Sequence, residues 1–199
     1  MKSENIKLIH LAVFASGGGS NAGVLTTFFE NHTNIRISLF VTNNPQSGVV
    51  ALGNKYNIPV RVISGKTLEE PSVVRPLLEE FGIDYLILAG FLKKIPDYLI
   101  KTYPDKIINI HPSLLPKYGG KGMYGHFVHE AVKNSGDERS GCTVHLVNEE
   151  YDKGRILHQT EIPVTAEMSA EDIAAAVLKE EHLCFAPVIE MYIRNREGL

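Results

Sequence analysis

The run Tyr85-Leu86-Ile87-Leu88-Ala89 contains no charged residue and predicts a short β-strand that is buried on both faces. Strands without polar alternation are typical of parallel sheets that helices cover on both sides. A segment with helical periodicity, Ser72–Phe81, precedes this run, and a second apolar run, Lys106-Ile107-Ile108, follows it. The centre of the chain therefore indicates alternating strands and helices.

The same alternation extends back to the beginning of the chain. The predicted elements are, in order, a strand at Ile6–Ala15, a helix at Asn21–Glu30, a strand at Ile35–Thr42, a helix at Gly48–Tyr56, a strand at Pro59–Ile63, a helix at Ser72–Phe81 and a strand at Tyr85–Ala89. Because crossovers between parallel strands are right-handed, this order predicts an α/β fold with an open, doubly wound, mostly parallel sheet and helices on both faces.

The second half of the chain has a different pattern. Four glycines within Lys117–Gly125 predict a mobile loop rather than a linker between domains. After it we expect a short helix at His126–Lys133, strands at Cys142–Val147 and Ile156–Ile162, and a final helix from Ala170 onward. Pro187 should kink or divide that helix. We therefore expect residues 1–199 to form a single domain.

Composition excludes several classes of function. The chain is 44% hydrophobic and 22% charged, with a net charge of -3, which gives no electrostatic reason to expect nucleic acid or an anionic membrane as a partner. No apolar run approaches the ~20 residues that span a bilayer, and Met1–Asn5 does not begin a signal peptide, so we expect a cytoplasmic protein. Cys142 and Cys184 are predicted to be buried thiols in a reducing compartment rather than a disulfide.

The tetrad Asn109-Ile110-His111-Pro112 ends a predicted strand with an amide and an imidazole two residues apart. Side chains with this spacing point to the same face of a strand, and the proline ends the ladder. A donor amide beside a group that titrates near neutrality suits a reaction in which an oxygen gains charge while a proton moves. The alternative is a buried histidine that bonds only to backbone.

The glycine-rich turn Ser16–Asn21, between the first strand and the first helix, has two interpretations. It is either a phosphate cradle at a helix N-terminus, or a tight turn in which Ser20 or Asn21 caps the helix. A dinucleotide fingerprint also fits the glycines, but the second strand ends in Val41–Asn44 without the carboxylate that a ribose needs. We therefore do not expect a nicotinamide cofactor.

Other polar residues are less specific. Asp152 lies in an acidic connection between two strands and is typical of a solvated turn, unless it contacts His111, where it would orient the imidazole. His126 and His129 share a helix face with Glu130, but no third ligand has a recognisable spacing, so we expect no metal.

The final helix carries an apolar stripe with a carboxylate close to it. At ~100° per residue, Glu180 falls within this stripe and Glu181 at its edge, so one of them faces inward and needs a partner. The spacing does not choose between the two. The stripe consists of Ile173, Val177, Cys184, Val188 and Met191.

The order of these motifs resembles the phosphoribosylglycinamide formyltransferases. The resemblance covers nearly the whole chain and lies in Ser16–Asn21, Leu88–Leu92, Asn109–Tyr118, Gly141–His145 and Asp152–Gly154. It implies the formyltransferase fold and the transfer of a formyl group from 10-formyltetrahydrofolate to the amine of glycinamide ribonucleotide in de novo purine synthesis. Methionyl-tRNA formyltransferases and formyltetrahydrofolate hydrolases share the block around His111, but 199 residues are expected to leave no room for their additional domains.

The resemblance also implies roles for individual residues. The N-terminal half would bind the ribonucleotide phosphate, and the C-terminal half would contribute the folate side and the catalytic loop. No ligand contact is assigned within Gly119–Gly125, and the oligomeric state is left open. The alternatives are a formyltetrahydrofolate hydrolase and a non-catalytic sugar-phosphate-binding module. The implied contacts are Gly19, Ser20 and Asn21 with phosphate, Glu181 with ribose, Leu92, Lys93, Lys94, Ile95 and Asn109 with folate, and Asn109, His111 and Asp152 as the catalytic trio.

Overall fold

The computed structural model describes residues 7–199, and its strands form one seven-stranded sheet. Ile6 and the stretch Met1–Asn5, on which two of the predictions above rest, lie outside the described residues. The strands are β1 (Ile9–Phe14), β2 (Ile35–Thr42), β3 (Val60–Val62), β4 (Tyr85–Leu88), β5 (Ile107–His111), β6 (Arg139–Leu146) and β7 (Ile156–Pro163). The helices are α1 (Ser20–Phe29), α2 (Gly48–Tyr56), α3 (Gly65–Leu68), α4 (Pro71–Glu80), α5 (Asp97–Thr102), α6 (His126–Ser135) and α7 (Ala170–Glu197).

The strand order is β3-β2-β1-β4-β5-β6-β7. Strands β1 to β5 pair in parallel, whereas β6 is antiparallel to β5 and β7 is antiparallel to β6. The predicted open, mostly parallel, doubly wound sheet is confirmed. From β1 the chain winds first toward β3 and then, after β4, toward the other edge. This reversal opens a crevice at the carboxyl ends of β1 and β4, where ligands bind in folds of this kind.

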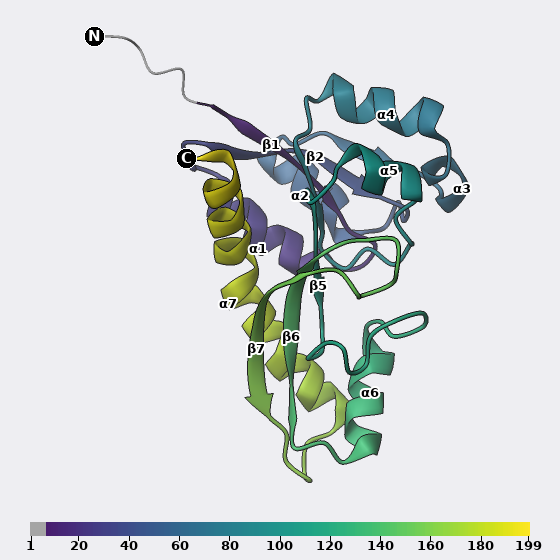
Figure 1. Cartoon of the computed structure of the whole chain (residues 1–199), viewed down its shortest axis with the longest axis vertical. Coiled ribbons are helices and arrows are strands. Elements are labelled where there is room, and N and C mark those ends of the chain that lie inside the picture. The colour runs from purple at the N-terminus through teal and green to yellow at the C-terminus, as the bar shows by residue number, and fades with distance from the viewer. Residues whose placement is uncertain (1–6) are drawn as a thin grey trace.

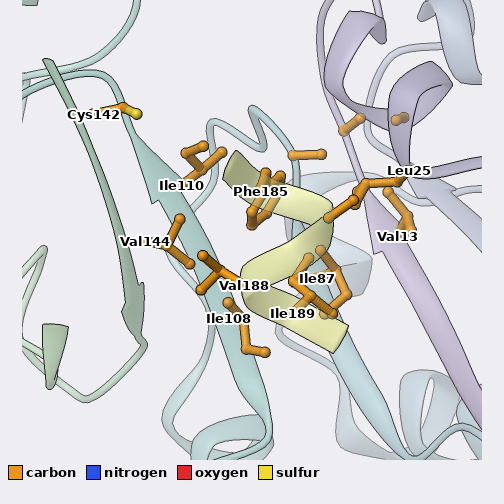
Figure 2. Packing of buried hydrophobic residues seen from close by; sticks show 14 of the residues in the cluster. Val13, Leu25, Ile87, Ile108, Ile110, Cys142, Val144, Phe185, Val188 and Ile189 are labelled. Atoms are coloured by element: carbon orange, nitrogen blue, oxygen red, sulfur yellow. The ribbon is translucent and has the colours of Figure 1, made fainter. Parts of the chain in front are cut away.

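Helices cover both faces of the sheet (Figure 1). One hydrophobic core contains the inward side chains of α1 and α7, and the other contains those of α4 and α5. Figure 2 shows Ile108 and Ile110 of β5 facing Val188 of α7 within the first core. Because side chains alternate along a strand, Asn109 and His111 point to the opposite face of β5.

Helix α7 differs from its prediction in two respects. It continues through Pro187, so the expected division is wrong. Proline cannot donate to the carbonyl of Leu183, but that residue is 62% exposed, and water can satisfy the carbonyl. Met191 is 52% exposed and does not belong to the buried stripe, which Phe185, Ile189 and Ile193 complete instead. Among the described helices, none combines the length and apolar character needed to cross a membrane.

Candidate active site

A cavity of about 720 Å³ lies at the carboxyl ends of the central strands. Gly17 follows β1, Gly90 follows β4, and Asn109 and His111 end β5, and all four line the cavity. Its volume falls within the ~300–1,000 Å³ typical of small-molecule sites. The predicted site residues that line it are Asn21, Leu92, Lys93, Asn109, His111, Asp152 and Glu181, whereas Gly19, Ser20, Lys94 and Ile95 do not.

The Asn109 amide is oriented by a histidine that the site prediction did not include. Asn109 Nδ2 donates to His145 Nε2 over 3.1 Å, while His145 Nδ1 donates to the Leu146 carbonyl over 2.8 Å. Asn109 and His145 face each other in the antiparallel β5–β6 register. Burial lowers the pKa of His145 and favours the neutral ring that this pair requires. The second hydrogen on Asn109 Nδ2 is left for a ligand.

The His111 ring is held through one nitrogen. Its Nε2 lies 2.8 Å from the Tyr118 carbonyl, and since a carbonyl only accepts, Nε2 carries a hydrogen. In the neutral ring Nδ1 is then the acceptor, and it lies 3.7 Å from Asp152 Oδ1. The ring is buried, with 4% of its surface exposed. Nδ1 is therefore the nitrogen that can gain and lose a proton beside a carboxylate.

Asp152 is held by the glycine-rich segment that follows the Asn109–His111 motif. Its Oδ2 accepts from the backbone N–H of Gly120 over 2.8 Å, and its Oδ1 lies 3.7 Å from both His111 Nδ1 and His145 Nε2. A Cβ at Gly119 would come within 3.2 Å of the Asp152 Cβ and 2.5 Å of Leu115, so this approach needs glycine. The structure thus brings Asp152 next to His111, as the catalytic interpretation requires.

Asn21 and Glu181, which are far apart in the sequence, meet at the cavity wall. Asn21 Nδ2 donates to Glu181 Oε2 over 2.7 Å, and Asn21 Oδ1 is buried without a hydrogen-bond partner. Burial raises the pKa of Glu181, which the bond from Asn21 opposes. Glu181 is only 7% exposed, whereas Glu180 does not line the cavity. Glu181 is therefore the glutamate that faces inward.

The glycine-rich turn is closely packed and leaves the N-terminus of α1 without a side-chain cap. Gly19 is the N-cap residue, with a φ of 76° in the left-handed region, and no side chain bonds to the first turn. The expectation that Ser20 or Asn21 caps the helix is therefore wrong. The N–H of Gly48 donates to Gly17, and a Cβ on Gly48 would lie 1.9 Å from the Gly18 carbonyl oxygen. The free N–H groups of α1 suit an anion.

The five residues predicted on the folate side, Leu92 to Ile95 and Asn109, divide between two cavities. Leu92 and Lys93 line the main cavity, while Lys94 and Ile95 line a neighbouring one of about 80 Å³, which shares Lys93 and Asn109 with it. The Leu92 N–H donates to the side chain of Ser16, so this backbone donor is already engaged. Lys94 lies 3.7 Å from Asp97.

The segment from Gly120 to Gly125, to which no ligand contact was assigned, lines the main cavity. Three of its glycines have positive φ: Gly120 at 99°, Gly122 at 90° and Gly125 at 51°. The carbonyl of Tyr118 and the N–H of Gly120 hold His111 and Asp152, as described above. His145 was not among the predicted site residues. Alternation along the strand places it on the face of β6 opposite to that of Cys142, which is a signal in the sequence, but only the strand register shows that it pairs with Asn109.

The histidines of α6 have different surroundings. His126 lies 2.8 Å from Glu130 at the surface, whereas His129 is buried and its Nδ1 has no partner. Burial, with the nearby His126 and His111, lowers the pKa of His129 to about 4. Within residues 7–199, no group of three or more His, Cys, Asp or Glu side chains is arranged to hold a metal ion.

A family model described as formyl transferase matches residues 9–189. The chain belongs to the formyl transferase family. It is 43% identical, over 192 residues and 94% of its length, to proteins named phosphoribosylglycinamide formyltransferase, chloroplastic, from Arabidopsis thaliana and Vigna unguiculata. It spans 66% and 61% of the lengths of these two plant relatives.

Solved structures of other proteins share the fold. A phosphoribosylglycinamide formyltransferase from Anaplasma phagocytophilum superposes with a TM-score of 0.86 at 32% identity, covering 95% of this chain and 89% of that chain. A formyltetrahydrofolate deformylase from Pseudomonas syringae superposes with a TM-score of 0.84 at 22% identity, covering 96% of this chain and 63% of that one. The fold alone therefore does not distinguish transfer from hydrolysis.

Proposed function

We propose that this chain transfers a formyl group from 10-formyltetrahydrofolate to the primary amine of glycinamide ribonucleotide, as the names of its plant relatives suggest for them. The observation that carries the proposal is the meeting of Asn109, His111 and Asp152 at one cavity wall, with Asp152 Oδ1 3.7 Å from His111 Nδ1. This arrangement suits an acyl transfer in which an amine attacks a formyl carbon directly, without a nucleophilic side chain.

Asn109 and His111 would stabilise the negative charge that develops on the formyl oxygen. The free Nδ2 hydrogen of Asn109 donates to this oxygen, and His145 holds the amide in the required orientation. Because Nε2 is held by the Tyr118 carbonyl, His111 would donate to this oxygen from Nδ1 when that nitrogen carries a proton. The proton that the amine loses would reach the folate nitrogen through His111 or through ordered water. The Asp152 carboxylate, with Oδ1 3.7 Å from Nδ1, would orient the ring toward the reacting atoms.

The other wall of the cavity would hold the ribonucleotide. The uncapped N-terminus of α1, with Gly19, Ser20 and Asn21, would bind the phosphate through backbone N–H groups, and Asn21 is the one of the three that lines the cavity. Glu181, which Asn21 holds through its Nδ2, would accept hydrogen bonds from the ribose hydroxyls. In this division the N-terminal half binds phosphate and the C-terminal half supplies the catalytic loop.

The folate would lie against Leu92, Lys93, Lys94 and Ile95, which border the two neighbouring cavities that share Asn109. Because the Leu92 N–H donates to Ser16, the other backbone groups of this segment would bind the pterin. The partners are thus two small molecules, and the proposed location of the reaction is the cytoplasm.

Formyl transfer is tested by steady-state assays with both substrates. Replacement of His111 by Ala is expected to lower kcat by ~10²- to 10³-fold, the usual cost of losing one group that stabilises the oxyanion. His32→Ala is the control, because His32 does not line the cavity and bonds to Glu190. Wild-type turnover by His111→Ala would contradict the proposal.

Omission of the ribonucleotide separates the alternatives. A transferase releases no product without the amine, whereas a formyltetrahydrofolate hydrolase releases formate from the folate alone. A non-catalytic sugar-phosphate-binding module would bind the ribonucleotide without turnover in either assay.

A further inference from the structure

The two cysteines, 42 positions apart in the sequence, are in contact in the fold. Cys142 lies on β6 and Cys184 on α7, and their Sγ atoms are 3.7 Å apart. Cys142 belongs to the buried core between the sheet and α7, and Figure 2 shows it at the edge of this group. Both thiols are free. The proposed formyl transfer uses neither thiol.

The two thiols differ in exposure and in electrostatic surroundings. Cys142 is completely buried, whereas Cys184 is only partly buried and is the one that a small oxidant reaches first. The hydrogen bond between the two thiols lowers the pKa of Cys184, although burial acts in the opposite direction. The same bond raises the pKa of Cys142, and burial raises it further. Glu181 and Thr160 are the other groups that act on Cys184. Cys184 is therefore the more reactive thiol.

We propose that Cys142 and Cys184 form an oxidisable dithiol that hydrogen peroxide converts to an intramolecular disulfide. The Cys184 thiolate attacks one peroxide oxygen, the O–O bond breaks, and a sulfenic acid and hydroxide result. Cys142 then attacks the Cys184 sulfur, the S–O bond breaks, and the hydroxyl leaves as water with a proton from the Cys142 thiol. In total, two thiols lose two electrons and two protons, and one peroxide is reduced to two waters.

The contact places the two sulfurs close together but not at bonding distance. The sulfurs of a disulfide are separated by about 2 Å, so the 3.7 Å gap must shorten by side-chain rotation or a small approach of α7 to β6. Both side chains belong to regular elements that pack on the same core. Because Cys142 is buried and adjoins Cys184, an intramolecular bond is favoured over a bond to another molecule.

Such a bond would act on the cavity through α7. Cys184 lies one helical turn after Glu181 and contacts the Glu181 carbonyl, with its sulfur 3.9 Å from the oxygen. Glu181 in turn accepts the 2.7 Å bond from Asn21 at the cavity wall. Drawing Cys184 toward β6 therefore displaces the turn that carries Glu181. This consequence, unlike the disulfide itself, rests on the proposed function.

Disulfide formation is tested on the reduced full-length chain, treated with hydrogen peroxide and then alkylated. We expect both thiols to disappear, the intact mass to fall by two hydrogen atoms, and a linked Cys142–Cys184 peptide to appear that dithiothreitol releases. Cys142→Ala is the matched control, in which Cys184 should gain oxygen without a link. Cys184→Ser, at a partly exposed position, should leave Cys142 unoxidised. Retained thiols, oxygen addition without a link in the wild type, or links between molecules only would overturn the proposal.

The effect on the cavity is measured as KM for glycinamide ribonucleotide before and after oxidation. A rise of about fivefold is expected, the factor that corresponds to one lost net hydrogen bond, and Cys184→Ser treated in the same way should not change. An unchanged KM in the linked protein would overturn the coupling to Glu181. Absence of transfer by the reduced protein would instead overturn the proposed function, because the peptide link is detected without activity.

Discussion

The orientation of one amide depends on the protonation of one buried histidine. Asn109 Nδ2 donates to His145 Nε2, which accepts only while the ring is neutral. Burial lowers the pKa of His145 and maintains that state. His145 does not line the main cavity, so it acts through Asn109 as a positioning residue rather than a catalytic one.

Replacing His145 by Phe keeps an aromatic ring but removes this acceptor. We expect kcat for formyl transfer to fall about 10-fold, the cost of one hydrogen bond that orients a donor, with KM for both substrates little changed. His158→Phe on the exposed edge strand β7 is the control. Wild-type kcat in His145→Phe would show that other contacts hold Asn109, and an equal loss in His158→Phe would make the effect non-specific.

At the scale of single elements, α7 is a long helix with an internal proline. Pro187 is exposed and supplies no N–H to its own helix, so that position lowers stability without obvious compensation in the fold. Pro187→Ala is expected to raise the free energy of unfolding by about 1–3 kcal/mol in urea denaturation.

Pro71 is the matched control for that substitution. It occupies the first position of α4, where the missing N–H costs nothing because the first turn has no intrahelical acceptor for it. Pro71→Ala should therefore leave the free energy of unfolding unchanged or lower it slightly. Equal stabilisation by both substitutions would contradict the explanation.

Sequence reasoning identified the elements with strong patterns and missed those without them. Ile35–Thr42 and Gly48–Tyr56 agree with β2 and α2 residue for residue, because apolar runs and glycine boundaries define them. Helices α3 and α5 were not predicted, since four and six residues are too few to show a period. The contact of Asp152 with His111 was also out of reach, because it depends on how the β6–β7 loop folds back.

At the scale of the whole molecule, the buried His129 links stability to pH. Its pKa is about 4 in the folded protein, below the usual value of 6.5, so between these values the unfolded chain binds more protons than the folded one. The contribution of neutral His129 to the free energy of unfolding is fully present above pH 6.5 and is lost as the pH falls toward 4. The slope reaches at most about 1.4 kcal/mol per pH unit.

Replacement of His129 by Leu removes this contribution. Urea denaturation at a series of pH values between 4 and 6.5 should give a flatter dependence for His129→Leu than for the wild type. His158→Leu, at an exposed position, should keep the wild-type slope. Parallel curves for the wild type and His129→Leu would rule out His129 as the source.

The bond between Asn21 and Glu181 joins residues 160 positions apart. During synthesis the ribosome delivers Asn21 long before Glu181, so the pair forms only after the first half of α7 has been made. A sugar phosphate held between the two would bind only chains in which α7 has packed against α1. Its binding would also resist unfolding of α7 from the sheet, because a ligand stabilises the state that it selects. The proposed substrate would thus act as a late check on completed folding.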